Sequence, residues 1–512
     1  MFFKNKIVKD TIMLTVMQLF LDSAALLLNV FINRRLGTSA MGILSLTGSF
    51  LVLAGTISNG NAFLCTSRLI SEELGKIRKN PNRVLRSGLM LCLILSFTVS
   101  AVLFGFSDII GNRFFHSSAM SHAVRLMPLA LIPGAFSACF KGYFNAFRKS
   151  SITAVSDILE FLVKAAVIIL ITLKTQNPAD GSVCAIMISG IIAGNLFSLA
   201  YLLIMFVKHH KKYSDKASLS FSKYASFALP IMAGGIITSA LSSANDALIP
   251  VTLRQYGDSV NDALSRFGIF EAIVIPTLFF PSVILCSMSG IIVSESARAA
   301  ARGNMERIQS ISKRLINYTL IFAVFSSAVL IKFGSEIGEL LGGGELAGKM
   351  ISIIAPVVPF IYLEIILEAL IKGMGLQGFS SLNYLAEYAI RISVVLIFIP
   401  RFGFYGIVAS YYTSNVIGNC SRLIKIMRHT KIRINIFKSV ILPIAYAFLT
   451  MGAVQLIMRI MGADGKSLPE IIIFTLLWSA SYFLIFRLFS DIGIFGDKKI
   501  GKLSELFVNN SQ

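Results

Sequence analysis

The most constraining feature of this 512-residue chain is a series of long apolar segments whose pattern occurs twice. Residues 128–142 begin with a proline and end with Lys-Gly, and residues 359–373 repeat this pattern at the same spacing. An Arg-x-x-Gly pattern likewise closes an apolar segment at residues 34–37 and again at residues 254–257. The sequence therefore predicts a membrane protein built from two homologous halves. Such a duplication is typical of transporters, in which one repeat rocks against the other.

Each Lys-Gly segment leads into an apolar segment with an acidic residue four positions before a basic one. In the first half Glu160 precedes Lys164. In the second half Glu387 precedes Arg391. Residues four apart share one face of a helix, so each pair is able to neutralise its own charge within a membrane. We predict two intramembrane ion pairs.

The composition requires most of the chain to lie in the membrane. Apolar residues make up 55% of the chain and charged residues only 14%, whereas an average soluble domain carries about 25% charged residues. These values predict an all-α polytopic membrane protein, because apolar runs of about 20 residues cross the hydrocarbon core as helices. We identify fourteen such runs, at 11–33, 41–66, 87–106, 124–147, 152–173, 184–207, 224–252, 265–292, 315–334, 350–372, 383–400, 403–425, 437–460 and 469–490.

The distribution of basic residues orients the chain. With the N-terminus inside, the inner segments carry about three times as many Lys and Arg residues as the outer ones, in accord with the positive-inside rule. We therefore predict that both termini are cytoplasmic. The net charge of +21 is concentrated in inner clusters such as 208–216 and 422–433. This location favours contact with anionic lipids over nucleic acid.

Other sequence features exclude several classes of protein. The basic N-terminus leads directly into a full-length span, which argues against a cleaved signal peptide. No connection is long enough for a soluble domain and no Walker motif occurs, which excludes ATP-driven transport within this chain. The six cysteines lie in or at the start of predicted spans, and we predict that they are small buried residues.

Prolines interrupt four of the apolar runs, where each removes a backbone hydrogen bond and bends the helix. We expect these helices to bend at an internal cavity, although proline is also simply common in membrane helices. The prolines are Pro128, Pro133, Pro230, Pro250, Pro276, Pro281, Pro356 and Pro359.

Ionised side chains inside a span are costly and usually face a cavity or a partner. Asp22 has no basic neighbour in sequence, and Asp246 has none within a helical turn. Each therefore needs a partner from another helix, a proton or a bound cation. Arg266 and Glu271 lie five residues apart in the eighth run, which is too far round a helix for a clean i, i+4 pair.

Four segments, at residues 141–164, 227–257, 291–304 and 399–410, resemble the polysaccharide-transport branch of the multidrug/oligosaccharidyl-lipid/polysaccharide exporter superfamily. Within this branch the sequence is similar to the stage V sporulation protein B-like proteins and to the MurJ-like lipid II flippases. The likeness covers all fourteen runs in order.

The resemblance implies two six-helix lobes, at residues 1–215 and 216–433, around a central cavity lined largely by spans 1, 2, 7 and 8. Residues 434–512 would add two further spans and a tail. The implied function is a flippase without catalytic residues, which moves an undecaprenyl-(pyro)phosphate-linked glycan precursor across the bacterial cytoplasmic membrane by alternating access. The glycan would be a polysaccharide repeat unit or a peptidoglycan precursor. Implied partners are this lipid, anionic lipids and cell-envelope glycosyltransferases.

The resemblance also implies a substrate site. Lipid II flippases carry cavity arginines that receive the pyrophosphate, and Arg266 matches the position of one of them. A guanidinium suits a phosphate because it donates two parallel hydrogen bonds. Glu271 and Asp22 are assigned to the same predicted substrate site. In lipid II flippases an arginine precedes the acid of span 1, whereas here Leu21 precedes Asp22.

The outer ends of spans 1 and 7 carry three further arginines. Arg34 and Arg35 close span 1, and Arg254 closes span 7. We predict that they add positive charge at the cavity mouth, although an interfacial arginine more often reaches for water.

Some flippases of this group bind sodium through an Asp on span 7 and an Asn-x3-Asp on span 11. Asp246, Asn383 and Glu387 supply oxygen ligands at the corresponding positions, so the resemblance implies sodium coupling, with proton coupling as the alternative. Arg391, one turn beyond Glu387, would instead act as a built-in cation.

Three other functions stay open at the level of sequence. A cation-coupled multidrug exporter would need carboxylates and aromatic residues in its cavity, and Arg266 disfavours it. A membrane-embedded glycan polymerase, ligase or acyltransferase would need clustered acid and base residues near a long external loop. A scaffold without transport activity would not need charges in the spans of both halves.

Overall fold

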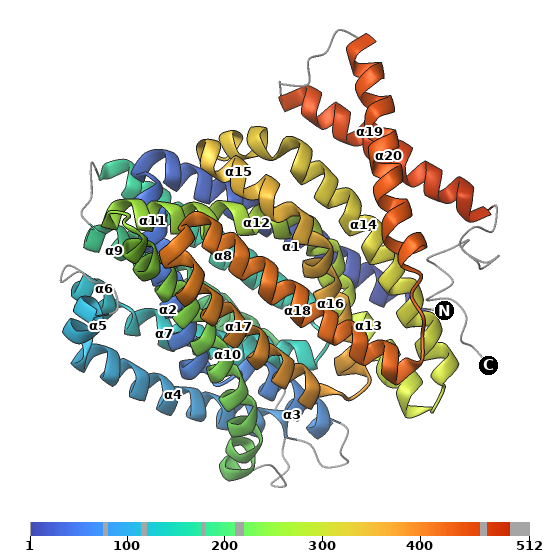
Figure 1. The fold of residues 1–512 in the computed structure, drawn as a ribbon. Coiled ribbons are helices and arrows are strands. Elements are labelled where there is room, and N and C mark those ends of the chain that lie inside the picture. Colours follow the sequence, from blue (N-terminus) through green and yellow to red (C-terminus); the bar gives the residue numbers. More distant parts are fainter. Residues whose placement is uncertain are drawn as a thin grey trace. The chain divides into compact units, whose positions relative to one another are not determined.

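The computed structural model describes residues 2–74, 80–113, 120–175, 180–209, 220–460 and 468–491. Every regular element within these ranges is a helix (Figure 1). In chain order they are α1 (Phe2–Leu36), α2 (Thr38–Asn59), α3 (Ala62–Leu74), α4 (Pro81–Gly105), α5 (Ser107–Arg113), α6 (Met120–Leu126), α7 (Pro128–Ala146), α8 (Ser150–Lys174), α9 (Asp180–His209), α10 (Phe221–Tyr256), α11 (Val260–Ile269), η1 (Phe270–Val274), α12 (Ile275–Phe279), η2 (Phe280–Ser282), α13 (Val283–Ala301), α14 (Met305–Leu340), α15 (Gly344–Ile354), η3 (Ala355–Val357), α16 (Val358–Gly373), α17 (Gln377–Phe402), α18 (Phe404–Thr430), η4 (Phe437–Ile441), α19 (Leu442–Ile460) and α20 (Leu468–Asp491).

The all-α membrane fold is confirmed. Twelve stretches of the described chain are long and apolar enough to cross a membrane, and they coincide with twelve of the predicted runs. The other two predicted runs form α8 and α18, which are continuous helices of 25 and 27 residues. These two helices are too polar to count among the twelve apolar stretches. For example, α8 contains the charged residues Asp157, Glu160 and Lys164. The count of fourteen therefore stays a prediction.

Large apolar side chains cover the outside of many helices. Phe97 is 71% exposed, Val207 is 76% exposed and Leu476 is 62% exposed. Such a surface suits contact with lipid tails. Cys65, Cys92, Cys139 and Cys184 are buried as predicted, whereas Cys420 is half-buried and Cys286 is exposed. The prediction was wrong for Cys286 because an apolar span has an outward face as well as a buried one.

The contacts divide the chain into two compact units. The first unit comprises Met1–Ser287, Leu341–Gly343 and Ser381–Ser414. The second comprises Met288–Leu340, Gly344–Ser380 and Asn415–Gln512. The division into lobes at residues 1–215 and 216–433 stays a prediction.

Several prolines coincide with breaks in the helices. Span 8 is divided into α11, a π-helical turn, α12, a 3₁₀ turn and α13, with Pro276 and Pro281 at two of the junctions. Pro356 lies in the 3₁₀ turn that separates α15 from α16. By contrast, α10 continues through both of its prolines.

The repeated Lys-Gly pattern marks the same kind of helix crossing in each unit. In the first unit a Cβ on Gly142 of α7 would lie 2.6 Å from the carbonyl oxygen of Phe63 on α3. In the second unit a Cβ on Gly373 of α16 would lie 2.7 Å from the carbonyl oxygen of Val293 on α13. Both glycines are therefore required because two helices cross in close contact, and this shared geometry supports the duplication.

The Arg-x-x-Gly pattern has a different cause. Gly37 follows α1 with φ of 89°, and Gly257 follows α10 with φ of 118°. Only glycine adopts such positive φ angles readily. These glycines let the chain reverse direction between the first two spans of each half.

The C-terminal helices of the second unit pack on α14 through an aromatic core. Trp478 of α20 is fully buried, and its Nε1 donates to the carbonyl oxygen of Ala447 on α19 at 3.1 Å. The hydroxyl of Tyr482 donates to the carbonyl oxygen of Ile321 on α14 at 3.0 Å. Because their polar ends are bonded, these aromatic side chains are able to fill an apolar interior.

Candidate functional site

A cavity of about 540 Å³ lies within the first unit. Its walls come from α1, α2, α8, α9, α10, η1 and one residue of α17. Spans 1, 2, 7 and 8, which were expected to line a cavity, all contribute, and spans 5 and 6 contribute as well. The polar lining residues are Asn29, Ser45, Ser49, Lys164, Thr172, Thr238, Ser239, Ser242, Ser243, Asp246, Glu271 and Tyr384.

Hydroxyl groups join α2 and α10 along one wall. The hydroxyl of Ser49 donates to Oδ2 of Asp246 at 2.6 Å. The hydroxyl of Ser243 donates to the carbonyl oxygen of Ser49 at 2.8 Å. Thr56 and Ser239 share a further hydrogen bond of 3.1 Å. These contacts fix the position of Asp246. The sequence predicted that Asp246 needs a partner from another helix, a proton or a cation, and Ser49 of α2 is such a partner.

The π-helical turn η1 places Glu271 in the lining of the cavity. Nδ2 of Asn29 on α1 donates to the carbonyl oxygen of Ala272 at 3.0 Å, so α1 satisfies a backbone group of the irregular turn. Single π-helical turns within α-helices are frequent at functional sites. Among the described residues, Glu271 itself forms neither a hydrogen bond nor a salt bridge.

Lys164 and Glu160 do not form the ion pair expected from their spacing. Glu160 instead accepts a hydrogen bond of 2.8 Å from Lys141 of α7, which also lies 2.7 Å from Asp157. Lys164 lines the cavity, and its Nζ lies 5.3 Å from the ring centroid of Phe161. Lys141 approaches from a neighbouring helix and contacts both carboxylates of α8, Asp157 and Glu160.

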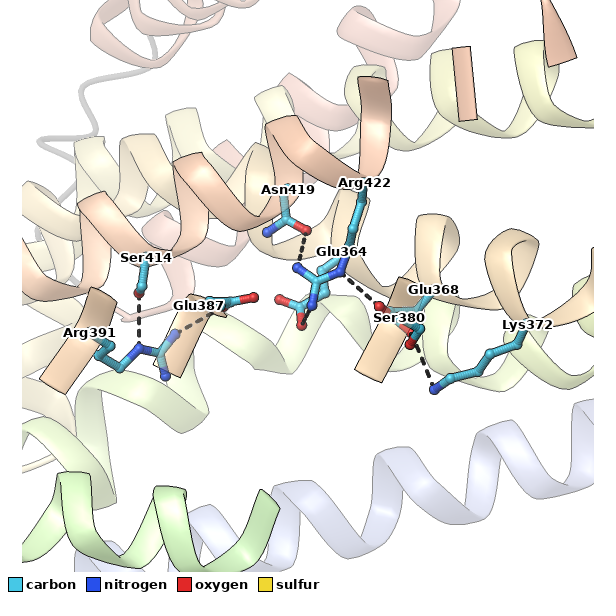
Figure 2. Close-up of polar contacts among 9 residues, drawn as sticks. All are labelled: Glu364, Glu368, Lys372, Ser380, Glu387, Arg391, Ser414, Asn419 and Arg422. Atoms are coloured by element: carbon cyan, nitrogen blue, oxygen red, sulfur yellow. Dashed lines mark hydrogen bonds and ion pairs between the residues drawn. The ribbon is translucent and has the colours of Figure 1, made fainter. Parts of the chain in front are cut away.

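Arg391 forms the pair that its spacing predicted. Its Nη2 lies 3.3 Å from Oε1 of Glu387, and its Nε donates to Ser414 at 2.9 Å (Figure 2). Its guanidinium carbon also lies 5.0 Å from the ring centroids of Tyr388 and Tyr411. Arg391 therefore joins Glu387 and Ser414 within the first unit.

The sodium ligands expected on span 11 are both buried. Asn383 is 7% exposed and Glu387 is 3% exposed. The carboxylate of Glu387 forms a salt bridge with Arg391. This contact agrees with the interpretation in which Arg391 takes the place of a bound cation. Within the described residues, no group of three His, Cys, Asp or Glu side chains is arranged to hold a metal ion.

The second unit contains a buried ion network that sequence reasoning missed (Figure 2). The side chain of Arg422 on α18 is 0% exposed. It lies 3.3 Å from Glu364 and 2.8 Å from Glu368, both on α16, and donates to Asn419 at 3.0 Å. The signal was the spacing of Glu364, Glu368 and Lys372, which places three charged residues on one face of span 10.

The remaining predicted site residues lie away from the cavity lining. Nε of Arg266 lies 3.3 Å from Oδ2 of Asp258, which lies in the turn before α11. Asp22 accepts a hydrogen bond of 2.8 Å from Gln18. The substrate contacts predicted for these residues therefore rest on sequence alone. The same is true of the exposed arginines at the helix ends, Arg34, Arg35 and Arg254.

The duplicated helical fold, the apolar exterior and the polar cavity define a multi-pass membrane protein. The chain belongs to the family described as "Polysaccharide biosynthesis protein", whose model matches residues 7–289. It is 20% identical over 427 residues to stage V sporulation protein B of Bacillus subtilis (strain 168), covering 81% of this chain and 82% of that protein. The resemblance to the polysaccharide-transport branch is thereby confirmed.

Two solved structures share the fold. The lipid II flippase MurJ in an inward closed conformation matches with a TM-score of 0.68 and 15% identity, covering 94% of this chain and 100% of that one. An inward-facing multidrug resistance transporter of the MATE family, in the MOP superfamily, matches with a TM-score of 0.65 and 14% identity. That match covers 81% of this chain and 96% of the transporter.

Proposed function

We propose that the protein is a flippase that moves an undecaprenyl-linked glycan precursor across the cytoplasmic membrane by alternating access. The observation that carries the proposal is the hydroxyl-rich cavity among membrane-spanning helices of a polysaccharide biosynthesis family member. Serine and threonine hydroxyls both donate and accept hydrogen bonds, so they are matched to the hydroxyls of a sugar. A volume of about 540 Å³ lies within the usual range of pockets for small ligands.

Lys164 is the basic residue that lines this cavity, and within the described chain no carboxylate forms a salt bridge with it. A phosphate that enters an apolar environment needs fixed positive charge to replace its lost water. Lys164 is therefore the residue that contacts the phosphate of the carrier lipid in this proposal. The sequence had suggested Arg266 for this contact.

A second candidate function is the export of small organic cations. It is favoured by the two carboxylates in the cavity lining, Asp246 and Glu271. The two candidates differ in the cargo that they require. A flippase needs the polyprenyl-linked glycan, whereas a drug exporter would respond to a permanent organic cation that bears no sugar.

Reconstitution into proteoliposomes tests the proposal. A labelled polyprenyl-diphosphate glycan in the inner leaflet is expected to become accessible to an added glycosidase only when the protein is present. Export of tetraphenylphosphonium without any movement of the glycan lipid would instead establish the second candidate.

Substitutions of Lys164 are expected to show that flipping depends on the positive charge of this side chain. Lys164→Ala should reduce flipping by at least about tenfold, because a hydrogen bond to a charged group is lost, and Lys164→Arg should retain most activity. The matched control is Lys174→Ala, since Lys174 is exposed in the last turn of the same helix. Unchanged flipping by Lys164→Ala at normal abundance would remove Lys164 from the site.

We further propose a location in the bacterial plasma membrane with both termini in the cytoplasm, which the basic inner clusters support. A single cysteine at Asn261 in a cysteine-free protein is expected to react with a membrane-impermeant reagent in intact cells. A cysteine at Ser310 should react only after the membrane is opened. Both positions are exposed in the structure. The opposite labelling pattern would invert the topology.

A further inference from the structure

The charges around the cavity of the first unit do not balance. Asp246 and Glu271 line the cavity, and Lys164 is the basic residue of the same lining. Asp246 is held by the hydroxyl of Ser49 and by the side chain of Asn245, which are neutral donors. The lining therefore carries two carboxyl groups and one ammonium group.

Such an imbalance favours a positively charged occupant when the cavity excludes water. A buried carboxylate is stable only if a counter-charge or several donors compensate for its lost hydration. Neither Asp246 nor Glu271 forms a salt bridge with Lys164 within the described chain. The two acids and Lys164 therefore offer separate negative and positive contacts to one ligand.

The surroundings of the two acids favour an organic cation that bears hydroxyl groups. A bare metal ion requires a compact shell of ligands, whereas both carboxylate oxygens of Asp246 already accept hydrogen bonds, from Ser49 and from Asn245. The cavity is instead large and is lined beside Asp246 by Thr238, Ser239 and Ser242. These hydroxyls suit a polar ring more than an isolated ion.

We propose that Asp246 and Glu271 receive an ammonium group on the transported head group, so that the cavity selects a glycan with a free amine. This inference rests on the proposed flippase function and adds the chemical class of the cargo. Lys164 would contact an anionic group of the same molecule, and the serine and threonine wall would contact the sugar hydroxyls.

Ligand-induced stabilisation of the purified protein provides the first test, because a ligand that binds only the folded state raises the melting temperature. The probes are glucosamine and N-acetylglucosamine, which share a sugar ring but differ in charge. Glucosamine is expected to raise the melting temperature and N-acetylglucosamine is not. In Asp246→Asn and in Glu271→Gln the affinity for glucosamine should fall by about tenfold or more.

Three comparisons make the test specific. The control variant Glu345→Gln removes an exposed carboxylate on α15 and should bind glucosamine like the unmodified protein. Equal stabilisation by both sugars would overturn the amine site. Stabilisation by sodium chloride over potassium chloride, lost in Asp246→Asn, would overturn it in favour of an inorganic cation. Stabilisation by tetraphenylphosphonium but not by glucosamine would overturn it in favour of drug export.

The proteoliposome assay distinguishes failure of this inference from failure of the proposed function. The glycan lipid is supplied with either a free or an acetylated amine, and the free amine should be moved at least tenfold faster. Equal movement of both lipids would overturn the amine site and leave the flippase standing. Movement of neither lipid would overturn the flippase together with the inference that rests on it.

Discussion

Arg422→Met is expected to lower the free energy of unfolding by about 3–5 kcal/mol, the usual cost of removing one partner from a buried ion pair. Arg422 is fully buried between Glu364 and Glu368, so its loss leaves two carboxylates in the interior. Within the described ranges, Lys372 is the only other base bound to either of them. Methionine replaces much of the side-chain volume, which limits the effect to the charge. The measurement is denaturation of the purified protein in mixed micelles.

The control for this prediction is Arg428→Met, which removes an exposed arginine from the same helix and should change stability by less than about 0.5 kcal/mol. A triple variant that adds Glu364→Gln and Glu368→Gln to Arg422→Met should recover much of the loss, because the network then holds no buried charge. Lys372, which loses its partner Glu368, is 53% exposed. If Arg422→Met alone were as stable as the unmodified protein, the network would contribute nothing to folding.

Gly142→Ala and Gly373→Ala are each expected to destabilise the protein by about 1–3 kcal/mol, because an added methyl group forces two backbones apart. The contacting atoms are carbonyl oxygens of Phe63 and Val293, which are unable to move like the end of a flexible side chain. The measurement is the melting temperature in detergent.

Two glycines where a Cβ would meet open space provide the matched controls. Gly55→Ala on α2 and Gly290→Ala on α13 should be neutral or slightly stabilising, by up to about 1 kcal/mol, since alanine favours a helix. A neutral result for Gly142→Ala as well as Gly55→Ala would mean that the crossing of α7 and α3 is not tight in solution.

The helices and the duplication could be predicted from the sequence because a bilayer restricts both strongly. A spanning helix must be apolar along its length, and a close helix crossing admits only glycine, as at Gly142 and Gly373. Asp246, Glu271 and Lys164 were identified as intramembrane charges for the same reason, and all three line the cavity.

The partners of these charges could not be predicted, since they depend on which helices pack together. The spacing of Glu160 and Lys164 allowed a pair within α8, but Lys141 on α7 bonds to Glu160 instead. Arg266 matched an arginine of related flippases, yet it is bonded to Asp258. Sequence spacing determines which residues of its own helix a side chain is able to contact. It does not determine which side chains of other helices pack beside it.

The contact between α7 and α8 bears on how the newly made chain enters the bilayer. Each charged residue at the centre of a helix opposes insertion through the translocon by about 2.5–3.5 kcal/mol, and α8 carries Asp157, Glu160 and Lys164. Lys141 on α7 is bound to both acids, and only residues 147–149 separate the two helices. We therefore expect α8 to leave the translocon as a hairpin with α7, its two acids already paired with Lys141. We expect it to fail to insert when it is synthesised without that neighbour.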